Sequence, residues 1–275
     1  MTKSYAIVSA HCPDENIPYI RELLSYDVRC PLSCTFARGE FGNILFNYAP
    51  SPLHWSRQVE WPWVLREGDF QHGQQVLDIG SGWSILKYAI AKRIKSGHDG
   101  ENDGCPLNDP ETFCHPATKG LDCSCPQGRL IALDNNKEFL ERTQPAIDLL
   151  NPERNIKQVH GDALALPFED NTFDRVVCVS VLEHIAEGHI KATQEAIRVL
   201  KPGGIALLTM DVVVNGPAGQ GNNFYLTKDG AEELVASLGI KTIFQPESGF
   251  VGATMDEGVG IVCMMIKYVK EGEFK

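Results

Sequence analysis

The sequence predicts an α/β fold in which a doubly wound, mostly parallel sheet ends in an antiparallel C-terminal strand. Short apolar runs typical of strands alternate along the chain with segments in which apolar residues recur at helical spacing. The first of these runs, residues 76–79, breaks directly into closely spaced glycines before a helical segment. Alternation of this kind places helices on both faces of a parallel sheet.

The glycine turn after the first strand is typical of a ligand-binding site. Gly80 and Gly82 permit positive φ angles and carry no Cβ, so a ligand can approach the main chain. Residues 84–94 follow as a helix whose free N-terminal amides face the same place. A glycine turn alone also serves packing, so the rest of the chain has to decide between the two interpretations.

The remaining elements continue the alternation. A helix around residues 190–200 is expected to stop at Pro202, and a helix is expected over residues 232–238. Residues 241–245 and 259–269 are predicted to form a closing hairpin, which adds the antiparallel strand. The other predicted strands are residues 129–133, 156–160, 173–179 and 205–210.

Residues 96–128 are predicted to be an insertion. Dinucleotide-binding sheets place an acid about 20 residues beyond the glycines, at the end of the next strand, to hold ribose hydroxyls. Here that acid is Asp134, which lies 56 positions after Asp78. The intervening 33 residues are rich in glycine, proline and cysteine and have almost no apolar periodicity. Removing them leaves 23 positions, which restores the expected spacing.

Four segments, in order, resemble the class I S-adenosylmethionine (SAM) dependent methyltransferases, especially the group that acts on small molecules and lipids. The segments are VLDIGSGWS, IALDNN, GDALALPFEDNTFDRVVCVSVLEHI and AIRVLKPGGIALLT. The resemblance covers roughly residues 74–210. It implies a SAM-binding, Rossmann-like domain over residues 71–275 with a Cys-rich insertion at 96–128, preceded by an N-terminal cap region at 1–70.

The resemblance also implies which residues bind SAM. The main chain of the glycine turn would meet the methionine part, and Asp134 would hold both ribose hydroxyls. The matching positions are Asp78, bracing the turn, Gly80, Ser81 and Gly82 in the turn, Asp134, Asn135 beside the adenine, Asp162 and Ala163 at the adenine edge, and Ser180 near the sulfonium. Trp83 and Ser84 depart from the pattern, because many relatives carry glycine at the second of these positions.

The residues separately favour SAM over a nicotinamide dinucleotide. A pyrophosphate calls for a third glycine where this chain has Ile85, whereas SAM has no phosphate. We therefore predict an enzyme, a SAM-dependent methyltransferase. Two alternatives remain open: a SAM-binding protein without turnover, and a nucleotide-cofactor oxidoreductase.

The segment RQVEWPWVL, residues 57–65, resembles a segment that precedes the glycine motif in some sugar-directed and related methyltransferases. We expect it to cap the SAM pocket, with Arg57 pairing with the SAM carboxylate. A second interpretation is that Trp61 and Trp63 anchor an N-terminal helix to the sheet.

Composition favours a small-molecule acceptor. A net charge of −11 argues against a nucleic-acid partner, because binding to phosphate backbones needs clustered Lys and Arg. The fourth strand is followed by Ser-Val-Leu-Glu rather than the Asn/Asp-Pro-Pro-aromatic signature of enzymes that methylate base nitrogens. No apolar stretch has membrane length and no signal peptide is evident, so a cytoplasmic location is predicted.

The insertion holds the candidate metal ligands. Their spacing is not the paired C-x-x-C form, so we predict a loop with reduced thiols and keep a zinc site as the alternative. The candidates are Cys105, Cys114, Cys123 and Cys125, with His115 adjacent and Cys30 and Cys34 as further ligands if the N-terminal region folds nearby.

His184 is the predicted general base for an O-directed transfer, because it follows the fourth strand at the ligand-binding edge of the sheet. Glu183, Asp211 and Tyr225 are the reserve candidates. The alternative is that Glu183 and His184 only begin a helix and shape the site. Residues 214–226, rich in Gly and Asn, are expected to form a loop over the acceptor.

Overall fold

The computed structural model describes residues 4–8, 16, 18–19, 21–23, 57–95, 128–151, 154–185, 187–215, 225–239, 254–255 and 259–271. The Cys-rich insertion except Gly128, the expected strand 241–245, and residues 216–224 of the expected acceptor loop lie outside these ranges.

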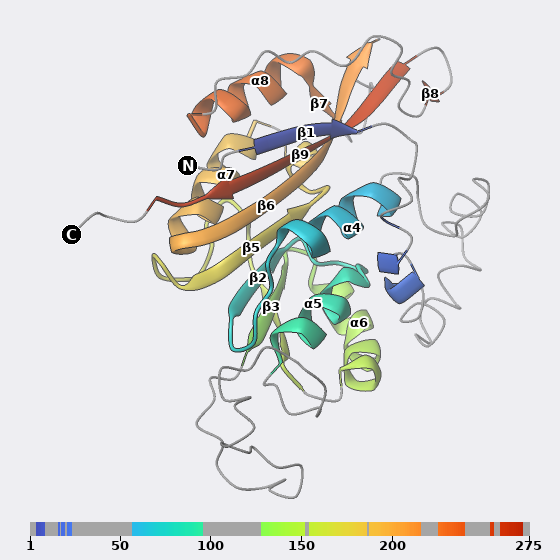
Figure 1. Cartoon of the computed structure of the whole chain (residues 1–275), viewed down its shortest axis with the longest axis vertical. Helices are drawn as coiled ribbons and strands as arrows, with labels where there is room; N and C mark the ends of the chain where they lie inside the picture. Colours follow the sequence, from blue (N-terminus) through green and yellow to red (C-terminus); the bar gives the residue numbers. More distant parts are fainter. Residues whose placement is uncertain are drawn as a thin grey trace, which may run out of the picture.

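One sheet of nine strands organises the described part of the chain (Figure 1). Its main path runs β1-β9-β6-β5-β2-β3-β4, with β7 beside β6 and β8 beside β9. Strands β6, β5, β2, β3 and β4 are parallel, whereas β9 is antiparallel to both β6 and β1. The strands are β1 Ser4–Val8, β2 Gln75–Ile79, β3 Arg129–Asp134, β4 Ile156–His160, β5 Phe173–Val179, β6 Leu200–Asn215, β7 Leu226–Thr227, β8 Thr254–Met255 and β9 Val259–Val269.

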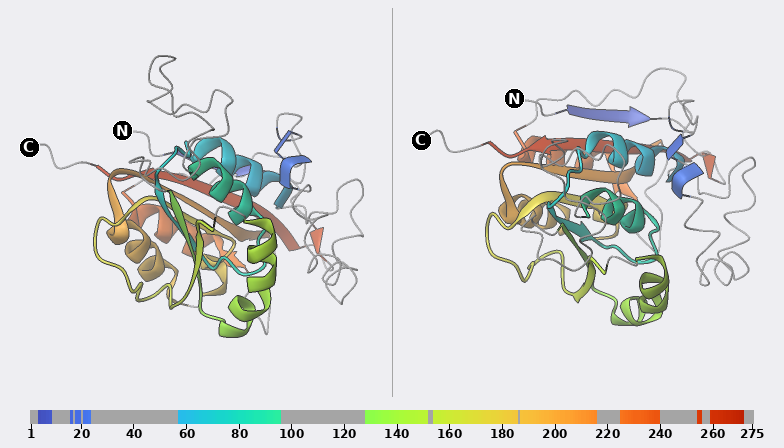
Figure 2. Two further views of the ribbon diagram at one scale, coloured as in Figure 1. Left: turned by 90° about the horizontal axis from the view of Figure 1, so that it is seen from below. Right: turned by 60° about the horizontal axis from the view of Figure 1, so that its bottom comes forward.

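Helices cover both faces of the sheet, so the prediction of a doubly wound, mostly parallel sheet with an antiparallel C-terminal strand is confirmed (Figure 2). Helices α4, α5 and α6 pack on one face, and α7 and α8 pack on the other. Neighbouring strand residues face opposite layers: Val76 joins the first core and Leu77 the second. The helices are α4 Arg57–Glu67, α5 Leu86–Ile94, α6 Lys137–Leu150, the short 3-10 helix η3 Leu182–His184, α7 His189–Val199 and α8 Lys228–Ser237.

Three local features differ from the expectations. Helix α5 begins two residues later than expected, because Ser84 belongs to the turn and its Oγ accepts a hydrogen bond from the Leu86 amide (3.2 Å). Strand β6 begins at Leu200 rather than at residue 205, and its pairing with β5 shifts register around Pro202, so the proline sits in an irregular stretch. The N-terminal region also contributes β1 to the sheet edge.

Strand β2 lies between β3 and β5, where the order of the parallel strands reverses. Ligands of doubly wound sheets bind outside the carboxyl ends of the strands at such a point. The glycine turn follows β2 there, as the sequence predicts. None of the helices within the described ranges has the length and apolar content needed to cross a membrane.

The glycine turn fits closely against the segment after β5. Gly80 has φ +66°, and a Cβ built there would lie 2.3 Å from Val181 Cγ2. Gly82 has φ +39°, but the nearest atom to its added Cβ is Asp134 Oδ2, at 3.5 Å. Both positions have a backbone conformation that favours glycine, and only Gly80 is also closed to a side chain.

Substitution Gly80→Ala should therefore lower the free energy of unfolding by about 2 kcal/mol or more, from left-handed strain plus overpacking. Gly82→Ala is the matched control, because it adds the same methyl group with strain alone and should cost less. Urea unfolding of both variants measures the difference. Equal losses would contradict the close contact with Val181, and Val181→Ala should recover part of the Gly80→Ala loss.

Candidate functional site

The predicted site residues gather at the carboxyl ends of β2, β3, β5 and β6 in two neighbouring groups. The first surrounds the glycine turn and Asp134. The second surrounds Glu60 of α4, and we call its members Arg57, Glu60, Ser180, Thr209 and Cys263 the Glu60 cluster.

Asp134 lies directly against the glycine turn. Its Oδ2 accepts a hydrogen bond from the Gly82 amide (2.9 Å), and its Oδ1 accepts one from the Asn136 amide (2.8 Å). The Gly161 amide donates to the Asp134 carbonyl (3.0 Å), which joins the end of β3 to the segment after β4. The acid is 7% exposed, and these contacts hold its carboxylate against the turn.

The predicted adenine-side residues follow the same two strands. Asn135 is exposed directly after Asp134. Asp162 is exposed and accepts a hydrogen bond from the Leu164 amide (2.9 Å), while Ala163 is buried. The structure thus brings all three positions to the carboxyl ends of β3 and β4, next to each other.

A buried lysine braces the glycine turn from within α5. Lys87 is 1% exposed, and its Nζ donates to the Gly82 carbonyl (2.8 Å). Burial raises the pKa of Asp78 to about 6, although the charge of Lys87 opposes the shift. Asp78 Oδ2 and Ser81 Oγ are buried without a hydrogen-bond partner among the described residues. The sequence analysis missed Lys87, because no feature of the helical pattern distinguishes this lysine from a solvent-exposed one.

Trp83, which directly precedes the departing position Ser84, packs on helix α6. Its ring centroid lies 5.6 Å from that of Phe139, and the Arg142 guanidinium carbon lies 5.3 Å from the Trp83 centroid. These contacts direct the large side chain toward α6, so it is accommodated beside the turn rather than across it.

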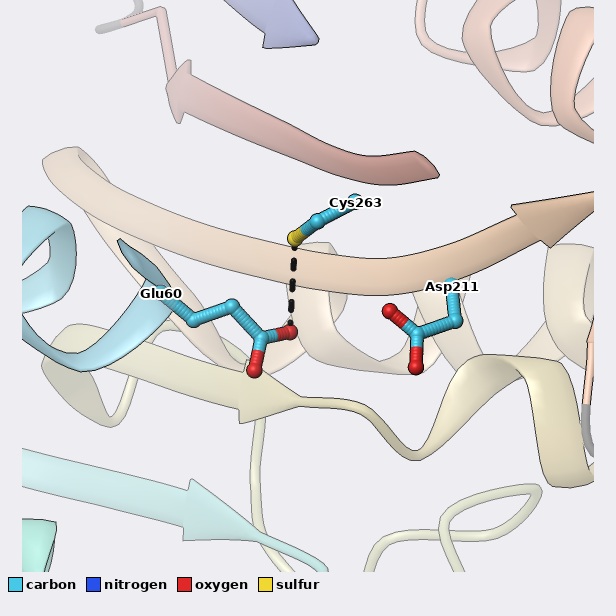
Figure 3. A group of neighbouring side chains, drawn as sticks. All are labelled: Glu60, Asp211 and Cys263. Carbon is cyan, nitrogen blue, oxygen red and sulfur yellow. Dashed lines mark hydrogen bonds between the residues drawn. The ribbon is translucent and has the colours of Figure 1, made fainter. Parts of the chain in front are cut away.

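Glu60 connects four elements of the fold. It is fully buried, and its Oε1 accepts hydrogen bonds from Ser180 Oγ (2.8 Å) after β5 and from Thr209 Oγ1 (2.6 Å) in β6. Cys263 Sγ of β9 donates to the same oxygen (3.5 Å), as Figure 3 shows. The other carboxylate oxygen of Glu60, Oε2, forms an ion pair with Arg57, whose guanidinium also donates to Ser180 Oγ.

The charges of this ion pair are retained despite burial. Burial alone would raise the pKa of Glu60, but the Arg57 charge and the hydroxyl hydrogen bonds outweigh it and lower that pKa. Burial would lower the pKa of Arg57, but Glu60 and then Asp211 outweigh it and raise that pKa. A carboxylate and a guanidinium therefore face each other within the site.

Arg57 lies at the entrance to the predicted methionine region. It contacts Ser180, and the next residue, Val181, packs against Gly80. This position is compatible with a contact to the SAM carboxylate. Trp61 and Trp63 are 9% and 6% exposed in the core, so the anchoring interpretation of this segment also agrees with the structure.

Glu183, which is buried, and Asp211, which is partly exposed, form an acidic pair beside the Glu60 cluster. The Asp211 amide donates to Glu183 Oε1 (3.1 Å). Burial, followed by the charge of Asp211, raises the pKa of Glu183 well above its usual range. Burial, followed by the charge of Glu60, raises the pKa of Asp211 to about 7, against the opposing effect of Arg57.

The predicted base, His184, lies in η3 next to Glu183 and is exposed. Partial burial, followed by the positive charge of Arg57, lowers its pKa, so the imidazole is neutral at neutral pH. Tyr225 is half-buried, and burial, then Asp211 and Glu183, raise the pKa of its hydroxyl. The structure thus brings the predicted base and its three reserve candidates together.

The described residues offer one group that resembles a metal site. Ligand atoms of Glu60, Asp211 and Cys263 lie within 4.8 Å of one another (Figure 3). Glu60 Oε1 already accepts three hydrogen bonds while its Oε2 pairs with Arg57, and burial raises the pKa of the Cys263 thiol well above its usual range. This donor set does not fit a metal ion. The predicted zinc candidates Cys105, Cys114, Cys123 and Cys125 lie outside the described residues.

Asp211 should make the stability of the protein depend on pH. Between pH 3.8, the ordinary pKa of aspartate, and about 7, the folded chain retains a proton that the unfolded chain releases. The free energy of unfolding therefore falls as pH rises through this window and stays low above it.

Substitution Asp211→Asn removes this loss. The variant should be more stable than the wild type at about pH 8, by roughly 2 kcal/mol or more, and the gain should vanish toward about pH 3. Urea unfolding across this range measures it, with the exposed Asp148→Asn as the control that should show no such trend. A pH-independent difference would contradict the raised pKa of Asp211.

Residues 117–208, about a third of the chain, match the family model of a methyltransferase domain. The match begins after the glycine turn and includes Asp134, Asp162 and Ser180. The chain is also 35% identical over 104 residues to demethylmenaquinone methyltransferase of several Staphylococcus aureus strains. This alignment covers 33% of the chain and 42% of that protein, so the chain spans less than half the length of the curated relatives it matches.

Solved structures share the fold at low identity. One is a chain from the structure titled "Complex between the Haloferax volcanii Trm112 methyltransferase activator and the putative methyltransferase" (13% identity, 90% of this chain and 98% of that one, TM-score 0.52). Another is an arsenic(III) SAM methyltransferase from Chlamydomonas reinhardtii (19% identity, 74% and 66%, TM-score 0.51). About a third of the chain is therefore similar to a methyltransferase domain, and its described part shares the fold of these structures.

Proposed function

We propose that this protein transfers a methyl group from SAM to a small-molecule acceptor. The observation that carries the proposal is the contact between the glycine turn and Asp134. The Asp134 carboxylate at the end of β3 accepts a hydrogen bond from the Gly82 amide in the turn after β2. SAM, when bound, supplies an activated methyl group on a sulfonium centre. The residues have to align the acceptor with that methyl group and exclude water.

The described side chains fit this cofactor in three respects. The turn leaves the main chain approachable at Gly82, where the nearest atom to an added Cβ lies 3.5 Å away, whereas Val181 fills the corresponding space at Gly80. Asp134 is an acceptor for ribose hydroxyls, and Ser81 Oγ is a buried polar atom that lacks a partner among the described residues. Arg57 supplies a charged donor for the amino-acid carboxylate. We extend the proposal to the other SAM-binding positions of the sequence analysis, with Asp78 and Lys87 holding the turn.

For the acceptor, we propose a hydroxyl-bearing metabolite, sugar or lipid precursor. His184 is neutral and exposed beside the acidic residues, so it is suited to take the hydroxyl proton as the oxygen attacks the methyl carbon. A cytoplasmic location and the absence of a nucleic-acid partner also stay predictions.

The basic experiment incubates the protein with SAM and a metabolite extract and measures S-adenosylhomocysteine. Formation of this product that depends on the extract supports the enzyme. Binding of SAM without product in any fraction would favour a SAM-binding protein without turnover. Binding of NADH with no binding of SAM would favour an oxidoreductase instead.

Substitution Arg57→Ala should weaken SAM binding by about tenfold or more, because a charge-assisted contact to the carboxylate is lost. Isothermal titration calorimetry measures the dissociation constant. Arg66→Ala on the same helix is the matched control and should leave it unchanged. An unaltered affinity of Arg57→Ala would contradict the carboxylate contact and leave α4 with the anchoring role.

Substitution His184→Ala should lower turnover of a hydroxyl acceptor by about a hundredfold or more, since general-base assistance is lost. The affinity for SAM should not change, because His184 is assigned no contact with the cofactor. Steady-state kinetics with the active extract fraction measures both. Full turnover in this variant would show that the reaction needs positioning alone.

A further inference from the structure

The acidic pair of Glu183 and Asp211 has no cation of its own among the described residues. Arg57 is the nearby cation, and it is already in direct contact with Glu60. Tyr225 before β7 and Cys263 on β9 interact electrostatically with Asp211, and neither adds a positive charge at neutral pH. His184 on η3 interacts with Arg57, and its lowered pKa keeps it neutral as well. Among the described residues, two carboxyl groups are therefore left against an ion pair that is neutral overall.

Each acid of the pair also has an oxygen without a donor. Glu183 is 4% exposed, and its Oε2 has no hydrogen-bond partner among the described residues. Asp211 Oδ1 is buried in the same way. A buried acceptor left without a donor costs free energy, and such atoms are rare in folded proteins. Two of them on adjacent carboxyl groups indicate a place for a ligand that donates hydrogen bonds.

The pair lies where an acceptor would meet the cofactor. Glu183 follows the predicted SAM contact Ser180 by three residues, and the Ser180 amide donates to the carbonyl of Thr209 (2.9 Å), two residues before Asp211. Asp211 is partly exposed as a residue. Glu183 lies just beyond the end of β5, and Asp211 lies in β6 two residues past the level at which β5 ends. Both acids are thus next to the region assigned to the methyl group.

We propose that Glu183 and Asp211 bind a protonated amine of the acceptor, so that the substrate class is a cationic small molecule such as an amino alcohol or an amino sugar. This inference rests on the proposed function and specifies its acceptor. An ammonium group donates three hydrogen bonds and carries one positive charge, which matches two unpartnered carboxyl oxygens. The sulfonium of SAM is also a cation, but it has no N–H or O–H to offer these oxygens. The α-ammonium of SAM does have N–H donors, and S-adenosylhomocysteine carries the same group, so an amine titrated into protein saturated with S-adenosylhomocysteine tests a second ammonium.

The pKa of Asp211 adds a pH dependence to this proposal. An amine prefers the ionised acid, so amine affinity should rise as pH increases through about 7, while the amine itself stays protonated. The two acids whose burial is unfavourable in the free protein are therefore the same acids that bind the cation in this proposal.

The test compares benzylamine with benzyl alcohol, which have nearly the same shape and differ in the charged group. Both are titrated by ligand-observed NMR into protein saturated with S-adenosylhomocysteine, above the pKa of Asp211. The protonated amine should bind at least about tenfold more tightly than the alcohol. Asp211→Asn and Glu183→Gln should each remove most of this preference, whereas Glu187→Gln, an exposed glutamate on the same segment, should keep it.

The same preparations separate this proposal from the proposed function. The affinity for S-adenosylhomocysteine should be unchanged in all three variants. A wild-type protein that does not bind S-adenosylhomocysteine would count against the proposed function itself. Equal binding of amine and alcohol by the wild type, or an undiminished preference in both variants, would overturn the amine site. So would variants that lose affinity for SAM but not for S-adenosylhomocysteine, because the acids would then recognise the sulfonium. If a variant fails to fold, the preference of the wild-type protein for the amine over the alcohol, and the increase of that preference with pH, still test the proposal.

Discussion

The buried carboxylate of Glu60 is the constraint on which the geometry of the site depends. One side chain from α4 accepts hydrogen bonds from Ser180 after β5, Thr209 within β6 and Cys263 within β9. It also pairs with Arg57, which contacts Ser180. Removing one member of a buried charged pair is strongly destabilising, because the remaining charge loses its partner. The N-terminal helix is therefore fixed to the carboxyl edge of the sheet at the place where a ligand would bind.

Ser180 shows how this constraint shapes the backbone. Its φ is +49°, a left-handed conformation that is uncommon for a residue with a side chain. It persists because its amide donates to the Thr209 carbonyl and its hydroxyl contacts both Glu60 and Arg57. Strained residues are retained where surrounding contacts determine them, often at functional sites. The turn after β5 thereby directs Val181 onto Gly80 and joins the two groups of site residues.

The sequence predicted the elements whose patterns are local. Strands β2, β3, β4, β5 and β9 and helix α7 follow from apolar runs and helical spacing, and the acid after β3 follows once the insertion is subtracted. The structure supplies the reason that the subtraction works: Gly128 lies against the Ile94 carbonyl, so the two ends of the insertion meet. A long insertion between adjacent ends costs little in loop closure, since that cost grows slowly with length. By contrast, the edge strand β1 and the path of β6 through Pro202 depend on pairing with distant strands.

The site was predictable only as far as a motif marks it. Asp78, Asp134 and Ser180 occur in recognisable segments, whereas Glu60 was passed over because a glutamate on a helix is normally solvated. Its role arises from contacts with residues more than 100 positions away. The acidic pair shows the same limit. Glu183 and Asp211 were separate reserve candidates in the sequence, but their pairing arises only in the fold, where burial and then neighbouring carboxylate charges raise their pKa values. Buried acids of this kind cost free energy of folding that neutral residues would not, and such costs are often retained at functional sites.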